Sequence, residues 1–156
     1  MADMMLETGD LAQCKLFQGL SNEELALFYK HGDITHHAPG DILVHEGYRW
    51  EKLYVILQGD VEIFLPKTDQ RFSKVTLTTL ETGQAFGEFS FIDSKPASAS
   101  VATSHDSTLY SIAYDALSNL LEQNDQLGRL VYKNLLVVLV DKLRTSNKEL
   151  DVLVLS

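Results

Sequence analysis

The spacing of hydrophobic positions changes twice along the chain and divides it into three stretches. In the first, apolar residues recur at near-helical spacing at Leu16, Leu20, Leu25 and Phe28. Ser21 stands three residues before Glu24, which is the pattern of a capping box at a helix start. We therefore expect N-terminal helices that end before a break at residues 36–40, His-His-Ala-Pro-Gly.

The middle stretch consists of short apolar runs separated by turns that contain glycine. Val61, Ile63 and Leu65 alternate with outward-facing positions, as the residues of a half-buried strand do. Similar runs lie at 42–44, 53–57, 75–77, 99–103 and 109–112. Many short strands at regular spacing with glycine in the turns indicate an all-β sandwich or barrel.

The last stretch returns to helical spacing. Leu117, Leu120 and Leu121 mark a short amphipathic helix, and Asn124-Asp125 interrupts it and can cap a second helix. From there to about residue 150 the chain has no proline and a single glycine, so the second helix is long. We expect one domain, with the N-terminal helices and β-structure in 1–112 and the C-terminal hinge and dimerisation helices in 113–156.

The run Leu-Leu-Val-Val-Leu-Val at 135–140 places apolar side chains around the whole circumference of the long helix. A helix that packs on a single neighbour needs only an apolar stripe. One side of this helix can lie on the β-structure, and a second copy of the chain is the simplest partner for the other side. The sequence therefore predicts a homodimer formed through the C-terminal helix.

Composition narrows the classes of partner. The chain has 156 residues, 13 basic and 22 acidic, with a net charge of −9 and no basic run, which argues against nucleic-acid and membrane-surface binding. Its one cysteine, Cys14, excludes an internal disulfide and a thiolate metal cluster. The acidic start lacks the features of a secretory signal, and the longest apolar run is too short to span a bilayer. We expect a cytoplasmic protein.

One segment carries candidate chemistry. Residues 86–101 read Phe-Gly-Glu-Phe-Ser-Phe-Ile-Asp-Ser-Lys-Pro-Ala-Ser-Ala-Ser-Val. This segment resembles the phosphate-binding cassette of cyclic-nucleotide-binding domains, as found in catabolite activator proteins, protein kinase regulatory subunits and cyclic-nucleotide-gated channels. The resemblance extends along most of the chain through the motifs at 16–21, 39–41, 46–47 and 53–56, and through Gly83.

The resemblance implies a mainly β fold with flanking helices: an antiparallel β-roll (jelly-roll, cupin-like) followed by a long C-terminal helix. It also implies a ligand, cAMP or cGMP or a related small anion, and no further cofactor. The ligand-binding residues it implies are Phe86, Gly87, Glu88, Phe89, Ala97, Ser98, Ala99, Thr145 and Ser146.

The roles of two cassette residues follow from their chemistry. Gly87 allows the backbone to approach a ligand closely, and the free N–H groups of a following helix can hold an anionic oxygen. Glu88 resembles the family's glutamate that accepts a hydrogen bond from the ribose 2′-hydroxyl. The other interpretation of Glu88 is an acidic residue that matches a helix N-terminal dipole. Thr145 and Ser146 are candidates for contact with the base, or else an exposed helix end.

The cassette departs from the family pattern at Ala97, where the family places an arginine against the cyclic phosphate. Losing one partner of a buried charge pair costs about 2–5 kcal/mol, which weakens affinity roughly 30- to 3000-fold. Ser98 could still donate a hydrogen bond to a phosphate oxygen. Lys95 is either a replacement cation or a solvated loop charge, and a lysine lacks the arginine fork.

Two functions therefore stay open. The first is a regulatory module that senses a cyclic nucleotide and signals through its C-terminal helix to a separate effector protein. The second is a degenerate domain that binds no nucleotide and serves as a dimerising interaction module. We expect no catalytic residues and no metal site, because Ser98 lacks a nucleophile-elbow context and the five histidines lack a partnered pair. Tyr48 and Trp50 cover the barrel end or contact a partner.

Overall fold

The computed structural model describes the backbone of residues 10–155 and the side chains of residues 10–150. Two four-stranded antiparallel sheets form a β-roll, with strand orders β1-β8-β3-β6 and β2-β7-β4-β5. Their strands are β1 (Asp33–His37), β2 (Ile42–Val44), β3 (Lys52–Gln58), β4 (Asp60–Leu65), β5 (Val75–Glu81), β6 (Ala85–Phe86), β7 (Ser100–Thr103) and β8 (Ser107–Ala113). The predicted antiparallel β-roll with flanking helices is confirmed.

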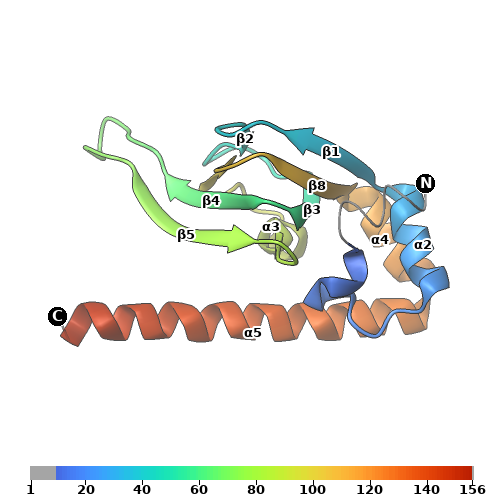
Figure 1. Cartoon of the computed structure of the whole chain (residues 1–156). Coiled ribbons are helices and arrows are strands. Elements are labelled where there is room, and N and C mark those ends of the chain that lie inside the picture. Colours follow the sequence, from blue (N-terminus) through green and yellow to red (C-terminus); the bar gives the residue numbers. More distant parts are fainter. Residues whose placement is uncertain (1–9, 156) are drawn as a thin grey trace.

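The flanking helices are α2 (Asn22–His31), α4 (Tyr114–Gln123) and α5 (Asp125–Leu155), preceded by two single-turn 3-10 helices at Leu11–Gln13 and Lys15–Phe17. In Figure 1, α2, α4 and the 3-10 helices lie at one end of the roll, and α5 runs from that end along the length of the roll. The short helix α3 (Glu88–Asp93) is the exception, because it follows β6 and precedes β7 in the chain and so interrupts the run of strands. The capping box at the start of α2 forms as predicted, with Ser21 and Glu24 each accepting a hydrogen bond from the other's backbone N–H.

Alternation along β3 divides the core into two clusters. Leu53, Val55 and Leu57 face the helices and join Phe17, Phe28 and the buried residues of α4 and α5. Ile56 faces the opposite way, into the roll, where it belongs to a smaller cluster that includes Phe86, Ala97 and Val101. Successive side chains of a strand point to opposite faces, so one strand serves both cores. Strand β6 lies next to β3 in the same sheet, and the cassette begins at Phe86 of β6. The cassette therefore begins at the boundary between the two clusters.

Two local features of the strands differ from what the sequence predicted. The predicted break at 36–40 begins too early, because β1 continues to His37 and pairs with β8 along its whole length. The two-residue strand β6 was not predicted, because so short a segment carries no measurable alternation. The predicted interruption at Asn124-Asp125 is confirmed, because α4 ends at Gln123 and α5 begins at Asp125. The Asn124 side-chain amide donates to the carbonyl oxygen of Leu120 at 3.1 Å, and its backbone carbonyl accepts from the N–H of Gly128 at 2.8 Å.

The exposure of the apolar side chains changes along helix α5. Leu127, Val131 and Leu135 are buried in the helix-side core. Beyond them, Val138 and Leu139 are half-buried, and Leu139 still packs against the helix-side core. The exposed large apolar side chains are Leu136, Val137, Val140, Leu143 and Leu150. Despite its length, α5 is not apolar enough to cross a membrane, and no other helix within residues 10–155 meets that requirement either.

Candidate functional site

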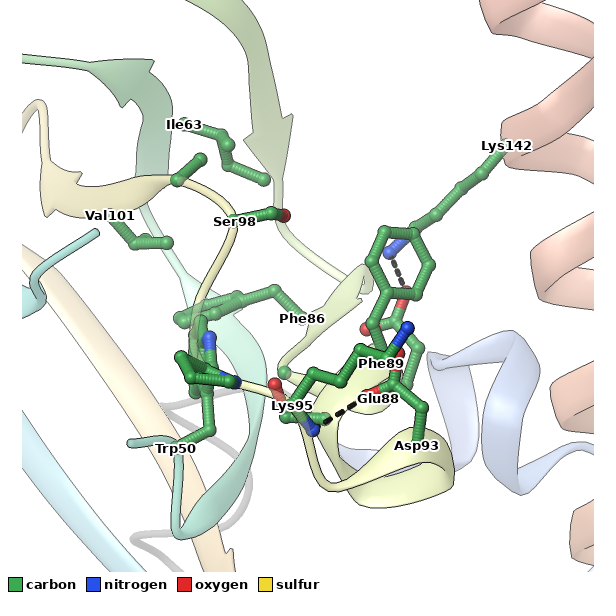
Figure 2. A pocket seen from close by; sticks show the side chains of 14 residues that line it. Trp50, Ile63, Phe86, Glu88, Phe89, Asp93, Lys95, Ser98, Val101 and Lys142 are labelled. Atoms are coloured by element: carbon green, nitrogen blue, oxygen red, sulfur yellow. Dashed lines mark hydrogen bonds and ion pairs between the residues drawn. The ribbon is translucent and has the colours of Figure 1, made fainter. Parts of the chain in front are cut away.

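A cavity of about 250 Å³ opens beside the cassette, between the roll and α5 (Figure 2). Its walls are formed by the start of α3, the loop between α3 and β7, and single residues from other elements. The lining residues are Trp50, Ile63, Phe86, Gly87, Glu88, Phe89, Ser90, Asp93, Lys95, Pro96, Ser98, Ala99, Val101 and Lys142. The cassette therefore supplies most of the surface, as a continuous segment folded around one space.

Gly87 makes the sharp turn that starts α3. Its φ of 92° lies in the left-handed region, which favours glycine. A Cβ at this position would lie 2.7 Å from the carbonyl oxygen of Lys52 and 3.0 Å from the ring of Trp50. The Tyr114 hydroxyl donates a short hydrogen bond to the carbonyl oxygen of Gly87 and so ties the turn to the start of α4. The backbone at the cavity is thus fixed by both sterics and hydrogen bonding.

Glu88 is the buried ionisable group of the site. Its side chain is 3% exposed and forms an ion pair with the ammonium group of Lys142 from α5. The Lys142 ammonium also donates to the carbonyl oxygen of Ala85 at 3.1 Å and lies 5.8 Å from the centre of the Phe89 ring. A buried carboxylate requires a partner, and this lysine supplies it from a residue 54 positions away in the chain.

Aromatic rings form the apolar wall of the cavity. Phe86 stacks on Tyr54 with ring centres 4.9 Å apart and an interplanar angle of 6°. Trp50 lies edge-on to both rings, at 6.1 Å from Phe86 and 6.2 Å from Tyr54. Trp50 therefore lines the cavity, whereas its neighbour Tyr48 is exposed. Flat apolar surfaces of this kind suit a planar ring system.

Burial shifts the ionisation of groups around the site toward their neutral forms. The pKa of Tyr114 is raised, first by burial and then by the negative charge of Glu88. Burial likewise raises the pKa of Tyr54, and raises the pKa of the Cys14 thiol to about 11 against the opposing effect of the Lys142 charge. The contribution of Glu88 to the raised pKa of Tyr114 reflects how near that carboxylate lies to the phenol.

Six of the nine residues predicted to bind a ligand line this cavity. They are Phe86, Gly87, Glu88, Phe89, Ser98 and Ala99. The other three are not among the lining residues. Thr145 and Ser146 are exposed, and the Thr145 hydroxyl donates to the carbonyl oxygen of Asp141 one turn earlier in α5.

Ala97, where the resemblance places an arginine, is not among the residues that line the cavity. Its side chain is 4% exposed and belongs to the core cluster inside the roll. Its backbone is held on both sides, since its N–H donates to the carbonyl oxygen of Tyr48 and its own carbonyl accepts from the N–H of Gly47, each at 2.8 Å. The cassette loop is therefore anchored at Ala97 to the loop between β2 and β3.

Sequence reasoning missed Lys142 and did not assign Trp50 to the ligand cavity. Both come from outside the cassette, from the β2–β3 connection and from α5. The only available signal was that Lys142 lies three residues before Thr145 in the helix segment already considered for ligand contact. Lys95, which the sequence left between two interpretations, does line the cavity, and its side chain is exposed.

Three of the five histidines pair with side chains that do not line this cavity. His36 pairs with the hydroxyl of Thr108 at 2.9 Å, His37 with Asp41 at 2.8 Å, and His105 with Asp60 at 2.8 Å. Among the side chains that the structure describes, no three potential metal ligands come together.

Comparison with known proteins adds an independent line of evidence. The sequence model described as "Cyclic nucleotide-binding domain" matches residues 34–124. The cyclic AMP receptor protein of Thermus thermophilus is 30% identical over 138 residues, which cover 88% of this chain and 61% of that protein. Glutaminase 1 of Bradyrhizobium diazoefficiens is 29% identical over 94% of this chain but only 23% of its own length.

Solved structures give the same fold. A cyclic nucleotide-binding domain from Methylobacillus flagellatus superposes with a TM-score of 0.79 at 28% identity, covering 94% of this chain and 80% of that one. The Thermus thermophilus catabolite activator protein superposes with a TM-score of 0.74 at 29% identity, over 89% of this chain and 62% of that one. The chain thus spans less than two thirds of the two curated relatives named here.

Proposed function

Because this chain belongs to the cyclic nucleotide-binding domain family, we propose that it is a non-enzymatic regulatory module that binds cAMP or cGMP in the cavity beside Glu88. The observation that carries the proposal is a carboxylate, 3% exposed, placed directly after the left-handed turn at Gly87 and facing a cavity. Lys142 compensates the charge of this carboxylate, and a carboxylate has further acceptor sites that a ligand hydroxyl can use.

The chemistry of the cavity fits the parts of a cyclic nucleotide. The Glu88 carboxylate can accept a hydrogen bond from a ribose hydroxyl, and the Ser98 hydroxyl can donate to a phosphate oxygen. The rings of Trp50 and Phe86 offer an apolar surface for a base or sugar face. The relative from Thermus thermophilus is named as a cyclic AMP receptor, so cAMP is the first ligand to test.

Signalling through α5 follows from how the cavity is built. Lys142 of α5 lines the cavity and contacts Glu88, so a bound ligand would alter the contacts of that helix. We expect the output to reach a separate effector protein or a further segment of a longer chain. The glutaminase relative is an example of a longer chain, since the region similar to this chain covers 23% of that protein.

Calorimetric titration with cAMP, cGMP and cyclic dinucleotides tests the proposed ligand directly. We expect a cyclic mononucleotide to bind, and Glu88→Ala to weaken its binding at least tenfold because the ribose loses its acceptor. Glu122→Ala is the matched control, an exposed glutamate on α4 outside the cavity. If the wild-type chain takes up none of these ligands at millimolar concentration, the sensor proposal is wrong.

A second function is favoured by one specific observation, the exposed apolar side chains on α5. Leu136, Val140 and Leu143 are large and exposed, and a second copy of the chain could cover them. In this alternative, the degenerate cassette with Ala97 binds no nucleotide and the chain acts as a homodimerising interaction module. A dimer in solution together with failure of every nucleotide titration would favour this alternative over the sensor.

A further inference from the structure

Two cations line the cavity, Lys95 and Lys142. The position at which the resemblance places an arginine is occupied by Ala97, whose side chain lies in the core of the roll. A cyclic phosphate carries a negative charge, and moving that charge out of water without a cationic partner is unfavourable. If a cyclic nucleotide binds here, these two lysines are the cationic side chains of the lining with which its phosphate can pair.

Lys142 is the better placed of the two because it is partly buried and already oriented. Its side chain is 28% exposed, and its ammonium group is held between the Glu88 carboxylate and the Ala85 carbonyl oxygen. In Figure 2 it enters from α5 on one side of the cavity, while Ser98 faces the same space from the opposite side. A cation held in low-dielectric surroundings interacts more strongly with an anion than one in water does.

Lys95 is exposed and lies beside a carboxylate. Its backbone N–H donates to the Asp93 carboxylate at 2.9 Å, and Asp93 also lines the cavity. An exposed lysine retains its hydration and its rotamer freedom, and both oppose tight pairing with a phosphate. The structure gives Lys95 no contact that orients its ammonium group toward Ser98.

We propose that Lys142 is the phosphate-binding cation of this cavity. Together with Ser98, it takes the role of the arginine that the resemblance places at position 97, where this chain has alanine. The proposal rests on the proposed cyclic-nucleotide function. An ammonium group has three N–H donors, of which the Glu88 carboxylate and the Ala85 carbonyl use two. The third can bond a phosphate oxygen while Glu88 accepts from the ribose. The ligand would thus be held by the cassette and by α5 together.

The test compares a ligand that has the phosphate with one that lacks it. Adenosine retains the base and the ribose 2′-hydroxyl of cAMP but has no cyclic phosphate. Calorimetry or fluorescence titration gives the affinity ratio of cAMP to adenosine for the wild-type chain, Lys142→Met and Lys142→Arg. We expect Lys142→Met to reduce this ratio at least tenfold, and Lys142→Arg to keep a higher ratio than the methionine variant because it retains the charge.

Lys15→Met is the matched control. Lys15 pairs with Asp141, the neighbour of Lys142 in α5, at 3.5 Å on the protein surface, so its removal deletes the same charge outside the cavity. We expect this variant to keep the wild-type ratio. Lys95→Met is measured in parallel, because a loss of the ratio there and not in Lys142→Met would assign the phosphate to the loop lysine and overturn the proposal.

The outcomes separate this proposal from the proposed function. If Lys142→Met weakens cAMP and adenosine equally, Lys142 only supports the shape of the site through Glu88, and its role as phosphate cation is wrong while the sensor function stands. If the wild-type chain binds cAMP no more tightly than adenosine, the cavity has no anion subsite and the proposal also fails. If neither cyclic nucleotide nor adenosine binds, the proposed function itself is wrong.

Discussion

The two halves of α5 differ in how they contact the rest of the domain. In the first half, residues 125–139, Leu127, Val131 and Leu135 are buried against the helix-side core. In the second half, residues 140–155, the described apolar side chains are exposed, and the described hydrogen bonds and ion pairs to the body are those of Asp141 and Lys142.

This difference separates the half of α5 that stabilises the domain from the half that we propose to transmit ligand binding. Apolar burial scales with area and anchors the first half firmly. A partly buried ion pair contributes less net stability, because desolvation offsets much of its attraction. The second half is therefore the part of the helix that a ligand in the cavity or a second copy of the chain can move at low cost. The following predictions test this division, beginning with the largest expected effect.

Matched leucine substitutions in the two halves should differ most in stability. Leu135 is 4% exposed and Leu143 is 62% exposed. Leu135→Ala should lower the free energy of unfolding by about 2–5 kcal/mol, because it removes buried methyl groups and leaves a cavity. Leu143→Ala should change it by less than about 0.5 kcal/mol in the monomer. Urea unfolding at low protein concentration measures both, and equal losses would contradict the division.

Charge in the second half should disrupt self-association without unfolding the domain. We expect the chain to form a two-fold homodimer through the exposed residues of α5, and Val140→Glu with Leu143→Glu to shift it to monomer. Multi-angle light scattering over a micromolar range, with circular dichroism to check the fold, measures this shift. A wild-type monomer at these concentrations would contradict the predicted homodimer.

Loss of Lys142 should loosen the second half selectively. Lys142→Met removes the hydrogen bonds to Glu88 and Ala85, so hydrogen–deuterium exchange of backbone amides in 140–150 should rise by roughly tenfold. Amides in 127–135 should keep their wild-type protection. Lys15→Met, which removes only the surface pair with Asp141, should have a smaller effect because exposed ion pairs contribute little.

The alkylation rate of Cys14 reports on the packing of the first half of α5. We expect this rate to show the smallest change of all. The thiol lies in the helix-side core with Leu127 and Leu135, and burial raises its pKa from 9.0 to about 11. At pH 8 only about one thiol in a thousand is then ionised. Alkylation should be correspondingly slow, and Lys142→Met should not accelerate it, since that variant leaves the first half in place.

The pH dependence of stability follows from the same thiol. Because the folded pKa is raised above the unfolded value, this contribution to stability is fully present below pH 9 and is lost as the pH rises toward about 11. Cys14→Ala should remove that part of the alkaline decline in unfolding free energy. An identical decline in wild type and variant would show that the thiol is not shielded as described.

Local sequence patterns determined much of this protein. The capping box at Ser21 and Glu24 acts through near neighbours, so its effect can be read without the fold. The predicted alternation of Val61, Ile63 and Leu65 holds only in part, because a register irregularity between Ile63 and Phe64 leaves Val61 and Phe64 as the buried residues of β4. Six predicted ligand residues line the cavity because they belong to one cassette that folds around it. By contrast, β1 has little alternation of its own and depends on pairing with β8.

The tertiary structure alone decided which distant groups complete the site. Trp50 and Lys142 reach the cavity because the sheets and α5 bring separate segments together, and neither the spacing nor the composition of the chain encodes that meeting. The same holds for Ala97 and Thr145: one turns into the core and the other into solvent. The direction of a side chain depends on how its backbone is positioned and oriented against the other elements. That position and orientation are fixed only when the whole core packs.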